Sequence, residues 1–116
     1  MTTATFVDVS TYMVFAYGGP GGNAGAEFAI SLDIPNAYAY LQFFPDSMPL
    51  PSNSKTTHVS GKPIYYVNYK HSQLAVILDM LRHEKPIKFF FRDDTLAAYI
   101  TTSKSLPNVK AAFYVN

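Results

Sequence analysis

Aromatic and basic side chains alternate between residues 65 and 99 in a pattern that could bind single-stranded nucleic acid. Lys88 and Arg92 flank Phe90 at intervals of two residues, so on a strand all three share one face. Bases stack on aromatic rings, at about 1–3 kcal/mol per base, and cations contact the phosphates. The complete set of candidate binding residues is Tyr65, Tyr66, Tyr69, Lys70, Lys88, Phe90, Arg92 and Tyr99.

The same residues have a purely structural interpretation. Tyrosine is common in strands, and lysine and arginine protect exposed strand edges from unwanted pairing. A formal net charge of +1 favours this interpretation, because nucleic-acid affinity depends on an excess of positive charge. Both interpretations stay open at this point.

Metal binding has a weaker basis in the sequence. Asp79 and His83 are four residues apart and could share a metal across one helical turn. A third ligand would have to come from Glu84 or from one of the other histidines, His58 and His71. Such an isolated pair is more typical of a solvated ion pair, so we expect no metal site and no metal cofactor.

Two further motifs resemble functional ones only in part. Gly19-x-Gly21-x-x-Ala24 matches a dinucleotide fingerprint, but that fingerprint needs a helix after the glycines, and the next segment alternates with a strand period. The pattern therefore predicts a hairpin loop and no dinucleotide cofactor. His71 and Ser72 are adjacent, but no Gly-x-Ser-x-Gly motif accompanies them and Ser72 fits a helix N-cap. We therefore expect no catalytic residues.

Composition points to a folded chain with little charge. The 116 residues are 48% hydrophobic and 15% charged, against about 25% charged in typical proteins. There is no cysteine, no Lys or Arg in the first 25 residues as a secretory signal needs, and no apolar run long enough to cross a membrane. These features predict a single domain over residues 1–116, cytoplasmic, without membrane contact, and prone to self-association.

Charge is distributed unevenly along the chain. Residues 1–54 contain four acids and no base, whereas residues 55–92 contain seven bases and two acids. Either the two halves pack together and neutralise each other, or the basic segment faces an anionic partner.

Period-two alternation predicts most of the secondary structure. Phe6–Tyr17 is expected to be one long strand, and 26–34 a second, followed by a turn at Pro35–Asn36. Residues 37–44 fit a helix or a strand, and we favour a strand because the turn before them suggests a hairpin. The other predicted strands are 64–70, 87–92, 96–102 and 109–115, and 45–57 is predicted to be a loop.

One helix is predicted over residues 73–84, capped by Ser72 and ended by Pro86. Its apolar arc is wide, because Val76 and Met80 extend the stripe formed by Leu74, Ile77, Leu78 and Leu81. Such a helix needs cover on more than one side, either from a curled sheet or from a second subunit. After the helix, a two-residue turn at Asp93–Asp94 would place Phe90 opposite Ala97 and Lys88 opposite Tyr99.

The sequence thus predicts an α+β fold: a mainly antiparallel, strongly curved or barrel-like sheet of six to seven strands packed on one helix. It favours a small non-enzymatic binding or interaction protein that forms a homo-oligomer. One alternative is a single-stranded nucleic-acid binder that uses the aromatic and basic face. Another is a carrier or enzyme with an apolar pocket between helix and sheet.

Overall fold

The computed structural model describes residues 4–18 and 25–102, and these form an α+β fold. Most of the glycine loop and the predicted strand 109–115 lie outside the described residues. The described strands are β1 (Ala4–Asp8), β2 (Thr11–Ala16), β3 (Phe28–Ile34), β4 (Ala37–Phe44), β5 (Ser54–Thr57), β6 (Pro63–Lys70), β7 (Lys88–Arg92) and β8 (Ala98–Thr101). A 3₁₀ turn, His71–Gln73, leads into helix α1, Leu74–His83.

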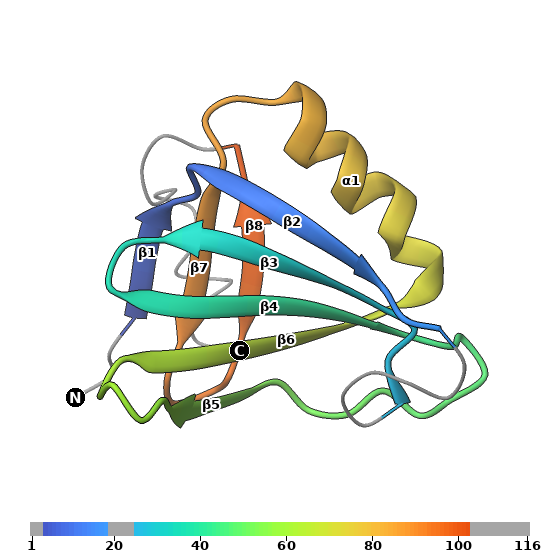
Figure 1. Ribbon diagram of the computed structural model, residues 1–116, viewed down its shortest axis with the longest axis horizontal. Helices are drawn as coiled ribbons and strands as arrows, with labels where there is room; N and C mark the ends of the chain where they lie inside the picture. Colours follow the sequence, from blue (N-terminus) through green and yellow to red (C-terminus); the bar gives the residue numbers. More distant parts are fainter. Residues whose placement is uncertain (1–3, 19–24, 103–116) are drawn as a thin grey trace.

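The prediction of one strongly curved or barrel-like sheet of six to seven strands is wrong. The eight described strands form two separate sheets, a five-stranded one in the order β2-β3-β4-β6-β5 and a three-stranded one in the order β1-β7-β8. Neither sheet closes or curls on itself. Pairing is antiparallel except between β4 and β6, which run parallel. In Figure 1 the three-stranded sheet lies behind the five-stranded one, and the strands of the two sheets cross steeply.

Two separate sheets arise because the predicted strand Phe6–Tyr17 is divided. The Val9 N–H donates to the Ile87 carbonyl at 2.9 Å, whereas the Ser10 N–H donates to the Asp33 carbonyl at 3.0 Å. Ser10 Oγ also donates to Asp33 Oδ2 at 2.7 Å. The chain therefore leaves the three-stranded sheet at Val9 and enters the five-stranded sheet at Ser10. Alternation alone does not reveal such a transfer, because both strands keep the same period.

The core lies between the two sheets and the helix. It is contributed by every second residue of β3, β4 and β6, for example Ile30, Leu41 and Val67, and we call this the inner face of the five-stranded sheet. Phe89 and Phe91 from β7 and Ile77 and Leu81 from α1 complete it. Successive side chains of a strand point to opposite sides. Ser31, Tyr40 and Tyr66 therefore lie on the opposite, outer face.

The turn between β3 and β4 follows its prediction closely. Residues 37–44 form a strand, and Ile34 pairs with Ala37 across Pro35 and Asn36. Asn36 has a φ of 56°, a left-handed conformation that asparagine tolerates better than most residues. The predicted loop 45–57 is correct except at its end, where Ser54–Thr57 pairs with β6 as the edge strand β5.

The turn between β7 and β8 is longer than predicted. Phe90 pairs with Tyr99 and Lys88 with Thr101, a shift of two residues from the expected register. The Arg92 N–H donates to the Ala97 carbonyl at 2.9 Å, so residues 93–96 form the connection. Leu96 takes a φ of 63° there. Leucine rarely adopts a left-handed conformation, so the sequence does not indicate this longer turn and favours the shorter one at Asp93–Asp94.

Helix α1 is confirmed to within one residue at each end, but Ser72 is not its cap. The Ser72 N–H instead donates to Oδ1 of Asp46 at 3.0 Å, from the loop after β4. The Lys70 N–H donates to Oε1 of Gln73 at 3.2 Å, which secures the first turn locally. A carboxylate at a helix N-terminus accepts a hydrogen bond from a free amide and interacts favourably with the positive end of the helix dipole.

We expect substitution of Ile77 by alanine to lower the free energy of unfolding by about 2–5 kcal/mol, because Ile77 lies on the buried side of α1, within the core. Val76, the preceding residue, is 64% exposed. Its replacement by alanine should change stability by less than about 0.5 kcal/mol. Urea titrations of both variants measure the two effects, and equal losses would contradict this orientation of the helix.

Asp46→Ala should destabilise the protein by about 1 kcal/mol, since the Ser72 N–H loses its acceptor. Asp46→Asn keeps an acceptor oxygen and should retain most of the stability. Lys70 Nζ donates to the backbone carbonyl of Asp46, so that contact survives in both variants and does not confuse the comparison. Equal urea midpoints for the alanine variant and the native chain would show that the cap contributes nothing.

Candidate binding surface

The structure distributes the eight sequence-predicted binding residues over three different regions. Tyr65 and Tyr69 point to the inner face of the five-stranded sheet, toward the core. Tyr66 and Lys70 are on its outer face. Lys88, Phe90, Arg92 and Tyr99 belong to the three-stranded sheet, on the side opposite the core residues Phe89 and Phe91. The eight side chains therefore do not form one surface.

The triplet on β7 does share a face, as its spacing predicts, but its charges are paired. Lys88 Nζ lies 2.6 Å from an Asp8 carboxylate oxygen, and Arg92 Nε lies 2.8 Å from an Asp94 carboxylate oxygen. Phe90 is only 1% exposed and stacks on Tyr99, with ring centres 4.6 Å apart. The acidic and basic segments neutralise each other here, since Asp8 comes from the acidic first half.

Tyr65 and Tyr69 pack against core residues. The Tyr65 ring lies 4.7 Å from Phe91 and 5.5 Å from Phe89, centre to centre, and its hydroxyl is 3.0 Å from Thr5 Oγ1. Tyr69 stacks on Phe43 at 5.4 Å. Burial disfavours the charged phenolate and raises the pKa of Tyr69 to about 12.

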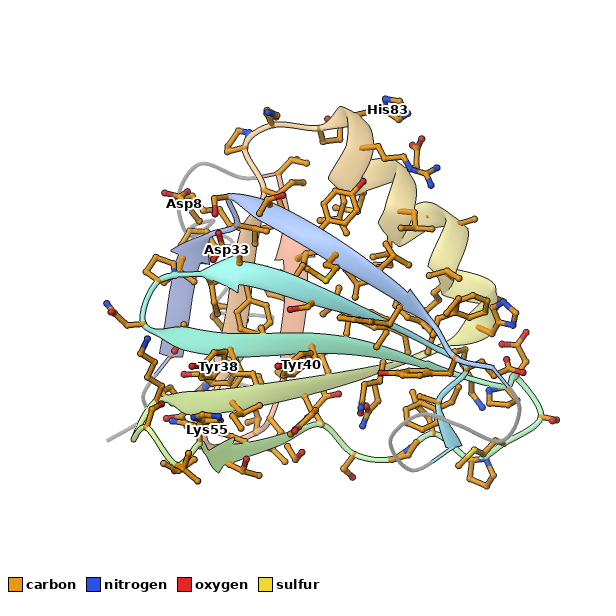
Figure 2. All side chains as sticks on the ribbon, in the orientation of Figure 1. Asp8, Asp33, Tyr38, Tyr40, Lys55 and His83 are labelled. Atoms are coloured by element: carbon orange, nitrogen blue, oxygen red, sulfur yellow. The ribbon has the colours of Figure 1, made fainter. Side chains whose placement is uncertain are left out.

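The outer face of the five-stranded sheet carries a row of aromatic rings that the sequence interpretation included only through Tyr66. Tyr40 stacks on Tyr66 with ring centres 5.7 Å apart, and Tyr38 lies 4.9 Å from the His58 ring. Figure 2 shows Tyr38 and Tyr40 side by side along β4. The period of two in β4 was the available signal, but the choice of face depended on which side is buried.

A shallow hollow of about 380 Å³ adjoins these rings on the outer side, between β2 and β4. Ser31 and Asp33 of β3 lie among its lining residues, together with Met13, Tyr38 and Lys62. Lys62 Nζ is 5.8 Å from the centre of the Tyr38 ring. Lys70, the other base on this face, donates to the backbone carbonyls of Asp46 and Met48, at 3.1 and 2.6 Å. This arrangement ties Lys70 to the loop after β4.

Strand β2 is the other notable feature, because it ends the five-stranded sheet with no strand beyond it among the described residues. The Tyr17 N–H donates at 3.0 Å to the carbonyl of Glu27, the residue that precedes β3. Hydrogen-bonding groups alternate in direction along an antiparallel strand. The N–H and C=O groups of Tyr12, Val14 and Ala16 therefore point away from β3, toward the open side.

The side chains of β2 are unusual for an exposed edge. Met13 is 60% exposed, Val14 42% and Phe15 38%, on both faces of the strand. The strand contains no charge, proline or glycine, the residues that normally keep an edge strand from pairing. Helix α1 runs alongside β2 in Figure 1, yet it leaves Val14 and Ala16 exposed. We call residues 11–17 the β2 edge.

Two histidines outside these regions lie near carboxylates. His83 Nε2 is 3.7 Å from Asp79 as an exposed pair on α1, and His71 Nδ1 is 3.2 Å from Glu27. Within residues 4–18 and 25–102, no three side chains of His, Asp or Glu gather into a group that could hold a metal ion. No helix in this part of the chain is long and apolar enough to cross a membrane.

Comparison of the chain with protein-family models, with curated proteins and with solved structures gives no significant match. The function proposed below therefore depends on the geometry of the β2 edge and the outer face.

The raised pKa of Tyr69 predicts a loss of stability in alkaline solution. An unfolded tyrosine has a pKa near 10, whereas the folded pKa is about 12. The neutral phenol is favoured in the folded state, so its contribution is complete below pH ~10 and falls as the pH rises toward 12. Tyr69→Phe should flatten the decline of unfolding free energy over this range, measured by urea titration at each pH. Unchanged slopes would contradict the assignment. At pH 7 the variant should keep wild-type stability within about 1 kcal/mol, since the ring remains.

Proposed function

We propose that this protein is a non-enzymatic interaction protein that binds an extended polypeptide strand at the β2 edge. A single observation carries the proposal: an uncharged terminal strand combines outward-pointing backbone groups with exposed apolar side chains. Strand addition supplies main-chain hydrogen bonds for affinity and covers the apolar side chains. The low charge of the chain supports the same proposal, because it leaves few groups to keep partners apart.

The alternative functions have less support from the arrangement of side chains. Nucleic-acid binding by the β7 triplet would need free cations and an accessible ring, whereas Lys88 and Arg92 are paired and Phe90 is buried. A carrier or enzyme of the predicted kind needs an apolar pocket between helix and sheet, whereas the hollow of about 400 Å³ between the end of α1 and residues 8–12 is lined in part by charged residues such as Asp8 and Lys85.

Val14→Lys provides the direct test. It places a charge in the middle of the β2 edge, where lysine prevents strand addition in natural edge strands. In a purified sample the available partner is another copy of the chain, and we expect the native protein to form dimers or larger species at micromolar concentration. Val14→Lys should weaken this association about tenfold or more, measured by static light scattering over a dilution series.

Val59→Lys is the matched control, since Val59 is 99% exposed in the turn between β5 and β6. It adds the same charge to the same residue type, and its association constant should equal that of the native chain. Amide hydrogen exchange at Tyr12, Val14 and Ala16 should also slow as concentration rises. Equal association of both lysine variants, with exchange at these amides independent of concentration, would overturn the proposal.

A further inference from the structure

We propose that the partner at the β2 edge is a second copy of this chain, paired antiparallel through its own β2 with Val14 opposite Val14 of the partner subunit. This inference rests on the proposed function and adds to it the identity of the partner, the symmetry and the register. The two five-stranded sheets then form one continuous sheet across the pair.

Symmetry favours the antiparallel arrangement. A two-fold axis perpendicular to the sheet reverses the strand direction while keeping both outer faces on the same side. The inner faces, with the three-stranded sheets and helices that cover them, then also lie on one side. Parallel pairing by a two-fold axis along the strands would place the apolar inner face of one copy next to the outer face of the other. The two cores would then lie on opposite sides of the combined sheet.

The backbone of β2 determines the register. Only the even-numbered residues Tyr12, Val14 and Ala16 direct their N–H and C=O groups to the open side, as the bond from Tyr17 to Glu27 establishes. Pairing must therefore join even residues to even residues. With Val14 on the axis, Tyr12 faces Ala16 of the partner subunit and every outward-pointing group of the strand is used.

Two neighbouring registers also join even residues to even residues, but they pair β2 less completely. A shift of two residues in one direction would pair Ala16 with Ser10 of the partner, but the Ser10 N–H already donates to the Asp33 carbonyl. A shift in the other direction would pair Tyr12 with Gly18 of the partner, beyond the end of β2. The register centred on Val14 is therefore the one that matches the extent of the strand.

Side-chain chemistry agrees with this register. On the outer face Met13 lies opposite Phe15 of the partner subunit, a thioether against an aromatic ring, and the contact occurs twice by symmetry. Met13 is 60% and Phe15 38% exposed in the single chain, so both have apolar surface to bury. The strand Thr11–Ala16 carries no charge, so its pairing with a second β2 brings no like charges together.

Engineered cysteines can test this register by cross-linking, because the chain has no native cysteine. Met13→Cys and Phe15→Cys are made as separate single variants at exposed positions, mixed, and oxidised under mild conditions. Opposite residues in a non-hydrogen-bonded antiparallel pair have Cα atoms about 4.5 Å apart, within the range that a disulfide spans. We expect mass spectrometry to find the mixed Met13→Cys/Phe15→Cys dimer, with neither variant cross-linking to itself. Val59→Cys mixed with either variant is the control and should give no dimer.

The outcomes separate this inference from the proposed function. Cross-linking of either single variant to itself, or no cross-link at all, overturns the inferred register. The proposed function still stands in that case if Val14→Lys weakens association and Val59→Lys does not. A monomer at every concentration, or association that ignores Val14→Lys, overturns both. The mixed dimer together with a Val14→Lys effect supports both.

Discussion

The packing of Tyr65 against Phe89 and Phe91 is the contact on which the two-sheet arrangement depends. Tyr65 comes from β6 of the five-stranded sheet, and the two phenylalanines come from β7 of the three-stranded sheet. Its hydroxyl reaches Thr5 on β1, and Lys55 Nζ on β5 lies 5.6 Å from its ring centre. The Tyr65 side chain therefore contacts three other strands, β1 and β7 of the smaller sheet and β5 of its own. Its ring packs against apolar groups while its hydroxyl has a hydrogen-bond partner.

This packing also explains where the molecule is open. The three-stranded sheet and α1 together cover the inner face of the larger sheet, whereas among the described residues no further sheet or helix lies on its outer face (Figure 1). A sheet without closure keeps its edges, and β2 and β5 are the edges here. β5 is a strand of four residues that includes Lys55, whereas β2 is longer and uncharged. The difference between the two edges is the reason for proposing β2, and not β5, as the interaction surface.

Part of the uneven charge along the chain is paired within the described structure. Asp8 and Lys88 pair across β1 and β7, joining the acidic first half to the basic segment. The loop after β4 contributes Asp46, which caps the 3₁₀ turn before α1 and receives Lys70 at its backbone. Lys55 and Asp93 pair at 3.0 Å within the later part of the chain. The β2 edge takes no part in these pairs, because the strand Thr11–Ala16 contains no charged residue.

Local sequence patterns determined several of the elements of this protein. The alternation in β3, the Pro35–Asn36 turn and the apolar spacing of α1 were sufficient, because each depends on residues close together in the chain. The same patterns placed Lys88, Phe90 and Arg92 on one face correctly. They also indicated a helix with more apolar surface than one layer covers, and Val76 is indeed exposed.

Tertiary structure alone decided how these elements share the core and which surfaces stay open. The division of Phe6–Tyr17 between two sheets depends on hydrogen bonds from Val9 and Ser10 to residues distant in the sequence, Ile87 and Asp33. The burial of Tyr65 rather than Tyr66, and the pairing of Lys88 with Asp8, likewise depend on contacts between separate strands. Alternation with a period of two shows that a strand has two faces. It does not show which face packs against the core or which strand lies at the edge of the sheet. Those choices are made by packing between distant segments, so the β2 edge could be recognised only in the folded chain.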